Sequence, residues 1–329
     1  MNIQTLSLAV TLTALSAIAG ADDTVEEKAG RSQPLLWQDP GNIGARDLFY
    51  GSGGKAGQPG KKFTFLKEDR GGSAPKFNVR DENGTEWAVK FGDEARPEVA
   101  ATRLVWAVGY FTDDDYLVPS LYVDGLPRLS RGRSELGPDG SVPNARLERR
   151  SPNVKWKGSW KWRKDELTGT RELNGLRVLM ALLNNWDAKD SNNSVLVASD
   201  GSRPIYAVGD LGSTLGPAGF ALPLHRSDVN GFTRSKFIVK VTPEYVNFAS
   251  PGYPGFMRVF ALPRFVKRLQ MRSVGQHVPR WDAKWIGRLL AQLSPEQIRS
   301  AFRAAGYSPA EVEALADTIE RRIALLTDL

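Results

Sequence analysis

The sequence contains no cysteine, and its only histidines, His225 and His277, lie far apart along the chain. Without cysteine, thiolate catalysis, disulfide bonds and cysteine-ligated zinc are excluded. Two distant histidines provide little for a histidine-rich metal site or a Ser-His-Asp triad, and no G-x-S-x-G motif is present. The sequence therefore disfavours most classes of hydrolase.

Long apolar runs are also missing, because no stretch beyond the N-terminus approaches the roughly 18 consecutive apolar residues of a membrane span. Residues 6–19 form a shorter run that ends in two small-residue cleavage patterns, at 17–19 and 19–21. This pattern predicts a signal peptide over residues 1–21 and an exported protein, periplasmic or extracellular, with no transmembrane span. The alternative is an apolar N-terminal helix, since no Lys or Arg precedes the run.

The net charge is moderate, because 44 Lys and Arg against 37 Asp and Glu give +7 over 329 residues. This balance favours anionic partners such as nucleotide phosphates and is too small to indicate nucleic-acid binding. Residues 22–60 are rich in Gly, Pro and charge, which predicts a flexible or loosely docked leader. The sequence around 55–62 is not a P-loop, since Lys55 and Lys62 stand where that motif needs Gly and Ser or Thr.

A small antiparallel sheet is predicted after the leader. Short apolar stretches at 63–66, 76–79 and 87–91 are typical of strands. Asn83-Gly84 predicts a type I′ turn, whose central residues both need positive φ, so the second and third strands should pair. The Gly-bearing connection 68–74 would let backbone amides approach a phosphate, and its alternative is an ordinary hairpin loop.

A helix is predicted over residues 98–108, because Pro97 stands near its start and Gly109 follows its end. Residues 145–149 predict a last strand and a hinge. Residues 171–183 are apolar on more than one face, which is typical of a helix buried in the centre of a lobe. Two short strands and three tail helices are expected beyond it, over 195–197, 205–208, 282–290, 295–305 and 309–327.

The stretch 184–193 carries polar residues in the order of a kinase catalytic loop. Asp187, Lys189 and Asn192 match D-x-K-x-x-N, and Asp210 opens a D-L-G that can stand for the metal-binding D-F-G. Upstream, a predicted strand ends in Val89-Lys90, and Glu98 follows eight residues later. Each signal is weak alone, but together they occur in the required chain order and on the required elements.

On these motifs the chain resembles the protein-kinase-like superfamily over about residues 63–327, in the style of its HipA-type and phosphatidylinositol-kinase-like members. The resemblance implies an α+β, bilobal fold with a small antiparallel β N-lobe that carries one helix, and a mainly helical C-lobe. The expected boundaries are 61–147 for the N-lobe and 148–329 for the C-lobe.

The resemblance also implies ATP and Mg²⁺ as cofactors and a role for each residue. Lys90, held by Glu98, would contact the α and β phosphates, while Asn192 and Asp210 would hold metal. Asp187 would take the proton of the acceptor hydroxyl, and Lys189 would neutralise the γ-phosphate. The amides of the loop would cradle phosphates at Gly71, Gly72 and Ser73.

Several departures disfavour a conventional Ser/Thr kinase. Trp186 replaces the Arg that precedes the catalytic Asp, which makes control through a phosphorylated activation loop doubtful, and the spacing from Lys90 to Glu98 is short. The triplet 242–244, Thr-Pro-Glu, mimics A-P-E but interrupts an alternating stretch, which indicates a strand or turn.

Residues 155–164 interleave three tryptophans with five positive charges. Such a composition can dock a phosphorylated, acidic or glycan partner. The favoured alternative is a surface segment of the C-lobe with its Trp rings tucked underneath.

The sequence therefore predicts an exported, ATP- and Mg²⁺-dependent phosphotransferase whose acceptor hydroxyl belongs to a protein, lipid or glycan. The first alternative is an exported pseudokinase that serves as a nucleotide- or partner-binding scaffold, because ATP is expected to be scarce outside the cytoplasm. The second is a cytoplasmic, HipA-like protein whose N-terminus is not a signal peptide.

Overall fold

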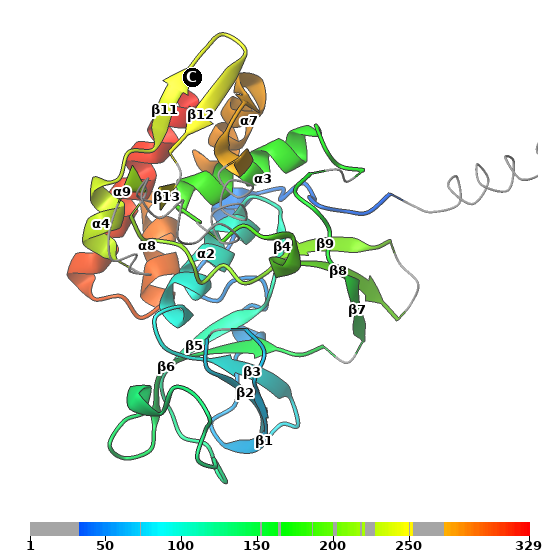
Figure 1. Cartoon of the computed structure of the whole chain (residues 1–329), viewed down its shortest axis with the longest axis vertical. Helices are drawn as coiled ribbons and strands as arrows, with labels where there is room; N and C mark the ends of the chain where they lie inside the picture. The colour runs from blue at the N-terminus through cyan, green and yellow to red at the C-terminus, as the bar shows by residue number, and fades with distance from the viewer. Residues whose placement is uncertain are drawn as a thin grey trace, which may run out of the picture.

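The computed structural model describes residues 33–72, 74–151, 153–163, 166–185, 187–199, 203–217, 219–220, 228–249, 251–252 and 273–329. In these ranges a small sheet forms one lobe and a mainly helical body forms the other (Figure 1). The predicted signal peptide over 1–21 lies outside the described residues. None of the helices in these ranges combines the length and apolarity needed to cross a membrane.

The N-lobe sheet has five antiparallel strands in the order β1-β2-β3-β6-β5. One of its faces is apolar, with Phe77, Val79, Val89 and Leu147 fully buried in one cluster. The alternating pattern that predicted strands here is therefore the pattern of a sheet whose two faces differ in polarity. The strands are β1 (Phe63–Asp69), β2 (Lys76–Asp81), β3 (Glu86–Lys90), β5 (Asp115–Leu121) and β6 (Val142–Arg149).

The predicted hairpin between β2 and β3 is confirmed, but its turn differs from the expected type I′. Gly84 has a φ of 82°, whereas Asn83 is not among the residues with positive φ. The Asp81 carboxylate shapes the loop instead, because its Oδ1 accepts the amides of Asn83 and Thr85 at 3.0 and 2.9 Å. The hydrogen bonds to the Asp81 carboxylate thus stabilise the turn, which therefore needs no second residue with positive φ.

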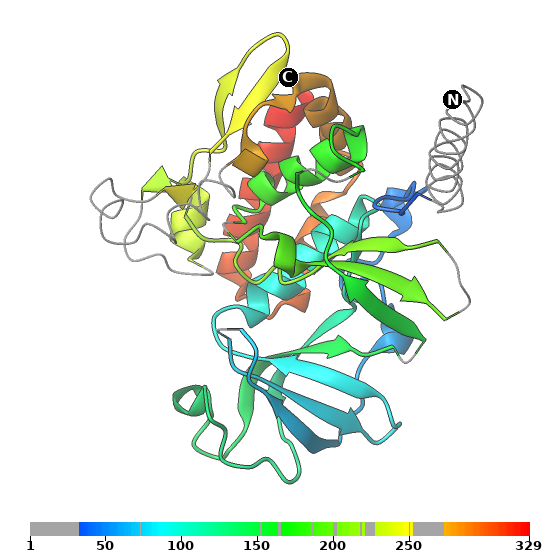
Figure 2. The ribbon, with the colours of Figure 1, turned by 45° about the vertical axis from the view of Figure 1, so that its right-hand side comes forward.

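Helix α2 (Ala95–Ala107) is the single helix of the N-lobe and covers the sheet on the side that faces the C-lobe (Figures 1 and 2). Pro97 lies in its first turn, as the sequence predicts. Gly109, just beyond the helix, has a φ of 99°, and a Cβ there would lie 2.2 Å from the carbonyl oxygen of Gln38. Only glycine therefore fits at this end of the helix.

The C-lobe is built around the buried helix α3 (Arg171–Leu182), on which α7 packs (Figure 1). Ser294 and Ser308 each form a capping box with the residue three positions on, so both tail starts predicted from Ser-Pro are present. The other α-helices of this lobe within the described ranges are α4 (Val229–Arg234), α7 (Arg280–Leu290), α8 (Pro295–Ala304) and α9 (Pro309–Thr327).

Short sheets complete the C-lobe. A four-stranded sheet has the order β4-β9-β8-β7, and a second sheet has the order β11-β12-β14. The triplet 242–244 joins β11 to β12, in agreement with the expected turn. The strands are β4 (Phe111–Thr112), β7 (Val154–Gly158), β8 (Asn193–Ala198), β9 (Ile205–Val208), β10 (Gly219–Phe220), β11 (Ile238–Val241), β12 (Tyr245–Phe248), β13 (Pro251–Gly252) and β14 (Val278–Pro279).

The predicted flexible leader differs from the structure over its described part, residues 33–60. Leu36, Ile43 and Leu48 are buried in the main core. Leu35 bridges to β9 through two backbone hydrogen bonds of 2.8 and 2.9 Å, and the Gln297 amide donates to the carbonyl oxygens of residues 43, 44 and 46. The Gly and Pro residues of this segment lie in backbone that is irregular but packed. Composition alone does not distinguish such a segment from a flexible linker.

The predicted α+β, bilobal architecture is confirmed, with an antiparallel N-lobe that carries one helix and a mainly helical C-lobe. The boundary expected between residues 147 and 148 lies inside β6 and remains a prediction.

Replacement of Leu36 by alanine should lower the free energy of unfolding by about 2–4 kcal/mol, because the side chain is only 3% exposed in the core. Phe49, 42% exposed in the same segment, is the matched control, and its replacement by alanine should cost less than about 1 kcal/mol. Chemical denaturation measures both. Equal small losses would mean that residues 33–60 contribute no core.

Candidate active site

Lys90, the last residue of β3, is the centre of the polar contacts between the lobes. Its side chain is 3% exposed, and its Nζ lies 2.8 Å from Glu98 on α2 and 2.6 Å from Asp210. Glu94, just before α2, lies 3.4 Å away. The buried ammonium thus joins the N-lobe sheet, helix α2 and the loop that follows β9.

The electrostatics of this group follow from its burial and its partners. Burial lowers the pKa of Lys90, but Glu98, Asp210 and Glu94 outweigh it, so the pKa is raised and the ammonium stays charged. For Asp210, burial raises the pKa and Lys90 lowers it, with a net shift downward. The Asp210 side chain is 41% exposed, so an ionised carboxylate faces solvent beside a buried cation.

The residues after α3 form a compact loop. Asp187 is buried, and its Oδ2 lies 2.6 Å from the Nζ of Lys189. Asn192, in the short helix η4 (Asp190–Asn192), donates from Nδ2 to the Asp187 carbonyl oxygen at 2.8 Å and to its Oδ2 at 3.5 Å. Asn185 fixes the start of the loop, because its Oδ1 accepts the Asp187 amide at 2.9 Å.

A backbone hydrogen bond joins this loop to the D-L-G segment. The amide of Gly209 donates to the Asn192 carbonyl oxygen at 3.1 Å, immediately before Asp210. Asp210 itself has a φ of 50°, a left-handed conformation that is unusual for a residue other than glycine. Such backbone is found mostly where the surrounding structure holds a side chain in a particular direction.

Contacts therefore connect six of the nine residues predicted for the site, which come from distant parts of the chain: Lys90, Glu98, Asp187, Lys189, Asn192 and Asp210. Gly71 and Gly72 form no hydrogen bond or ion pair with this group in the described ranges. The Gly71 amide donates to Asp69 Oδ1 at 2.8 Å, and the carbonyl oxygens of both glycines accept from Arg131. Ser73 lies outside the described residues, as does Trp186.

Asp210 and Asn192 are the side chains that best suit a divalent cation. Asn192 uses its Nδ2 to hold Asp187, which leaves its amide oxygen as the atom for a metal, and carboxylate and amide oxygens are ligands that Mg²⁺ accepts. The described residues contain no cluster of three or more His, Cys, Asp or Glu side chains that could hold a metal alone. The remaining ligands would have to come from phosphate and water, as is usual for Mg²⁺.

Arg146, on β6, is a residue that the sequence motifs did not indicate. It is buried, with Nη2 at 3.1 Å from Glu98 and Nη1 at 2.7 Å from Glu148. Burial lowers the pKa of Arg146, but Asp115, Glu98 and Glu148 raise it well above its ordinary value. Glu98 is therefore shared between two cations, Lys90 on one side and Arg146 on the other.

Two carboxyls extend this network toward the D-L-G segment. Asp115 lies 3.4 Å from Arg146 Nη1, and neither of its oxygens has a hydrogen-bond partner among the described residues. Burial raises the pKa of Asp115 to about 7, against the opposing effect of Arg146. Burial also raises the pKa of Asp113, and a Cβ on Gly209 would lie 3.0 Å from its Oδ2.

The sequence carried one signal for this network. Residues 145–149 read Ala-Arg-Leu-Glu-Arg, so Arg146 and Glu148 lie on the same face of a predicted strand. Charged residues on the covered face of a strand are rare unless they are paired. Their partners Asp115 and Glu98 lie elsewhere in the chain, which is why the pattern alone does not identify the pairing.

The aromatic, basic segment 155–164 is divided between core and surface. Trp160 and Trp162 are buried, and Trp160 stacks on Tyr206 with ring centroids 5.9 Å apart. The Trp162 amide donates to the Asp190 carboxylate, in the loop after α3, at 3.0 Å. Trp156, in contrast, is 64% exposed.

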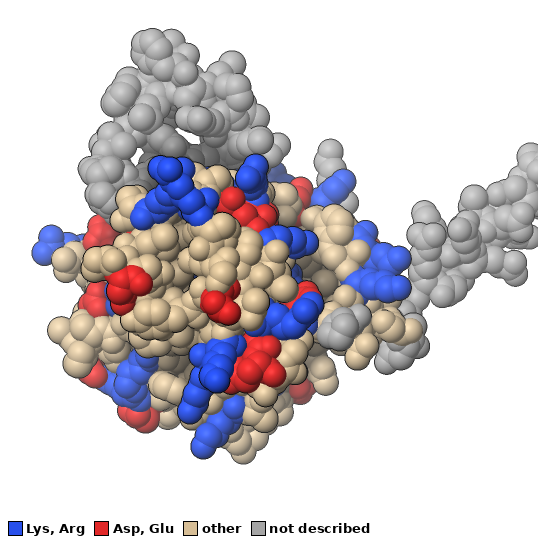
Figure 3. All heavy atoms as spheres, turned by 90° about the horizontal axis from the view of Figure 1, so that it is seen from below, with Lys and Arg blue, Asp and Glu red and all other residues tan. Residues whose placement is uncertain are grey.

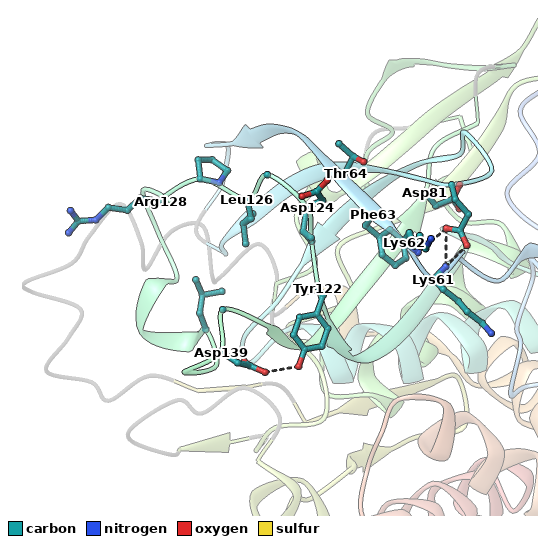
Figure 4. Close-up of a pocket in the computed structure, with 16 residues that line it drawn as sticks. Lys61, Lys62, Phe63, Thr64, Asp81, Tyr122, Asp124, Leu126, Arg128 and Asp139 are labelled. Atoms are coloured by element: carbon teal, nitrogen blue, oxygen red, sulfur yellow. Dashed lines mark hydrogen bonds between the residues drawn. The ribbon is translucent and has the colours of Figure 1, made fainter.

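A separate hollow of about 1020 Å³ lies on the outer side of the N-lobe (Figure 4). Lys61, Lys62 and Asp124 line it, and the Tyr122 hydroxyl donates to Asp139 at 2.6 Å at its rim. None of the predicted site residues lines this hollow. This hollow is therefore separate from the group of residues around Lys90.

Comparison with solved structures finds likenesses to kinases. The Helicobacter pylori proinflammatory kinase CtkA is 12% identical, with a TM-score of 0.47 over 82% of this chain and 97% of that chain. The Golgi casein kinase is 10% identical, with a TM-score of 0.33 over 81% of this chain and 75% of that chain. A structure of the Golgi casein kinase with Mn/ADP bound gives 10% identity and a TM-score of 0.31 over the same shares.

No protein-family model and no curated protein matches the sequence. Structural likenesses of this size assign no activity to this chain. The class that its own architecture and contacts define is a kinase-like fold with charged residues gathered between the lobes.

Replacement of Asp115 by asparagine should change how stability depends on pH. The folded protein keeps the Asp115 proton up to about pH 7, whereas the unfolded chain loses it near its ordinary pKa of 3.8. The stability that this proton provides is complete below that value and is lost as the pH rises toward 7. Relative to Asp115→Asn, the wild type should therefore lose up to about 1.4 kcal/mol per pH unit in this window.

Denaturation at a series of pH values measures this difference. Asp139→Asn is the control with the opposite sign, because hydrogen bonds from Ser141 and Tyr122 lower the pKa of Asp139 to about 2. Its contribution should be lost only as the pH falls toward 2. A difference between wild type and Asp115→Asn that is independent of pH would contradict the assigned burial.

Proposed function

We propose that this protein is an exported phosphotransferase of the atypical kinase class, which uses ATP and Mg²⁺ to phosphorylate a hydroxyl group of a protein, lipid or glycan. The observation that supports this most directly is the Lys90 ammonium, which lies 2.8 Å from Glu98 and 2.6 Å from Asp210. A strand lysine that pairs with a helix glutamate and with a D-L-G aspartate belongs to the parts that position a nucleotide triphosphate in kinases.

Charge neutralisation is the first task of such a site, because phosphoryl transfer concentrates negative charge on the phosphate oxygens. Lys90 binds the α and β phosphates, and its ion pair with Glu98 keeps it in place. Asp210 and Asn192 hold Mg²⁺, which when bound offsets phosphate charge and orients the transferred group. The exposure of the Asp210 carboxylate, beside a lysine that solvent scarcely reaches, supports this division of roles.

Proton removal from the acceptor is the second task. Asp187 takes the proton of the acceptor hydroxyl. The hydroxyl oxygen then bonds to the γ-phosphorus as the bond from that phosphorus to the leaving ADP breaks. Asn192 and Lys189 hold the Asp187 carboxylate in one orientation. The Lys189 side chain is also 43% exposed, so it can neutralise the γ-phosphate.

Export is supported by the apolar run and the cleavage patterns within residues 1–21, and sequencing of the mature N-terminus tests it. The competing hypothesis is a scaffold that binds a nucleotide or partner without transferring phosphate. The contacts that hold Asp187 favour an enzyme, because a binding module has no need of an oriented proton acceptor.

ATP with Mg²⁺ should stabilise the protein against unfolding, by about 2.7 kcal/mol when free nucleotide is about 100-fold above its Kd. Asp210→Asn should abolish the Mg²⁺-dependent part, because it removes the charged metal ligand. Asp139→Asn, an exposed carboxylate of the N-lobe, is the matched control and should keep the stabilisation. Thermal unfolding at several nucleotide concentrations measures the effect, and a wild type that ATP with Mg²⁺ leaves unchanged would contradict nucleotide binding.

Transfer of labelled γ-phosphate to a panel of protein, lipid and sugar acceptors should fall about 10²- to 10⁴-fold in Asp187→Asn, the range for loss of a general base. ATP binding should persist, because Asp187 is not assigned to the nucleotide. Asp190→Asn is the neighbouring control, since asparagine keeps an oxygen for the Trp162 amide. Asp187→Asn with wild-type transfer would refute the catalytic assignment, and ATP binding without transfer by the wild type would favour the scaffold.

A further inference from the structure

The segment from residue 149 to residue 164 carries a concentration of positive charge that the proposed reaction does not use. Its sixteen residues contain seven Lys and Arg and no Asp or Glu. On the N-lobe end of the molecule, in contrast, basic and acidic side chains are interspersed (Figure 3). The basic positions are Arg149, Arg150, Lys155, Lys157, Lys161, Arg163 and Lys164.

Strand β7 forms the exposed centre of this segment. It is the last strand in the order β4-β9-β8-β7, so within the described ranges only β8 pairs with it and its outer edge carries no strand. Residues 154–157 are all exposed, and Trp156 is 64% exposed. Side chains alternate along a strand, which puts Val154 and Trp156 on the face opposite to Lys155. Lys157 lies where the register between β7 and β8 shifts, between Trp156 and Gly158.

The sheet itself provides no acid to balance the two lysines. None of its four strands contains Asp or Glu, and neither Lys155 nor Lys157 forms an ion pair with a described residue. Among the described residues, Glu148 of the preceding strand is paired with Arg146 and Arg150. The positive charge of β7 is therefore available to an outside partner.

A groove of about 1150 Å³ adjoins the start of the strand. It is lined by Arg80, Arg149 and Arg150 and reaches Asn153, the residue before β7. Glu86 and Asp114 also line it, and the Glu86 carboxylate lies 2.6 Å from Arg80. Three basic and two acidic side chains therefore line the groove, and the two lysines of β7 follow directly beyond Asn153.

We propose that β7 and this groove bind an acidic peptide segment in extended conformation, which adds to the free edge of β7 as a further strand. Backbone hydrogen bonds along the open edge provide the affinity, as in other cases of strand addition. Glutamate or aspartate side chains of the partner meet Lys155 and Lys157, while Trp156 supplies the large aromatic contact typical of interface hot spots. A second copy of this chain does not suit the site, because two lysine-bearing edges repel each other.

The location of β7 relates this surface to the candidate active site. The strand begins four residues after β6 ends, and its partner β8 begins directly after Asn192. A peptide bound to β7 would therefore be attached to the C-lobe beside the catalytic loop. The binding itself requires neither ATP nor phosphate transfer, so it can be tested whether or not the proposed function holds.

The test is fluorescence anisotropy with the full chain and a labelled peptide of about eight residues that alternates Glu and Thr, a composition suited to a strand. The wild type should bind it, with affinity that falls as salt is raised. A peptide that alternates Glu and Pro has the same charge but cannot continue a hydrogen-bonded ladder, and it should bind at least about tenfold more weakly. Equal affinity for the two peptides would overturn strand addition.

The variants locate the surface. Lys155→Glu/Lys157→Glu should weaken binding of the Glu-Thr peptide at least about tenfold, and Trp156→Ala should weaken it several-fold. Lys67→Glu/Lys240→Glu is the matched control, because it makes the same change of net charge at exposed lysines on two other edge strands, β1 and β11. It should bind like the wild type.

Three outcomes would overturn the proposal: no binding by the wild type, undiminished binding by Lys155→Glu/Lys157→Glu, or equal losses in that variant and in the control. Thermal unfolding without peptide checks that each variant is folded, which is expected because the substituted side chains are exposed. Loss of nucleotide stabilisation in Asp210→Asn is independent of all three, so failure of this proposal is distinguishable from failure of the proposed function.

Discussion

The buried ammonium of Lys90 is the constraint on which the arrangement of the two lobes depends. An isolated charge cannot be removed from water at an acceptable free energy, so carboxylates must come to it. They come from α2 in the N-lobe and from the loop after β9 in the C-lobe. The same ion pairs that neutralise the lysine thereby fix the helix against the sheet and bring the D-L-G segment to the N-lobe.

Arg146 extends this arrangement into a network of buried charges. Glu98 is shared by Lys90 and Arg146, and Arg146 is in turn shared with Glu148 and Asp115. Removing one member of such a network leaves the others buried without a partner, which costs far more than the loss of an exposed ion pair. The network therefore favours one orientation of α2, the helix that carries the Glu98 partner of Lys90.

Local chemistry made much of this molecule predictable. The tail helices follow Ser-Pro starts, the N-lobe strands follow alternating patterns, and Asp187, Asn192 and Asp210 stand in a recognisable order. Long-range pairing was not predictable in the same way. Glu98 could be predicted as a partner of Lys90 from its spacing along the chain. Arg146 can be recognised as part of the network only in the structure, where its distant carboxylates lie beside it. The prediction for residues 33–60 was wrong for a related reason. Irregular backbone that packs on a distant part of the chain has no periodic sequence pattern by which it could be recognised.

The packing of residues 33–60 has a consequence for how the chain is made. Leu36, Ile43 and Leu48 are synthesised well before Gln297, whose amide holds this segment and lies 254 positions beyond Ile43. On the ribosome these apolar residues leave the exit tunnel before this part of their packing surface has been made. The nascent chain therefore completes the packing of this segment only after residue 297 has been translated, and until then it presents apolar surface to chaperones.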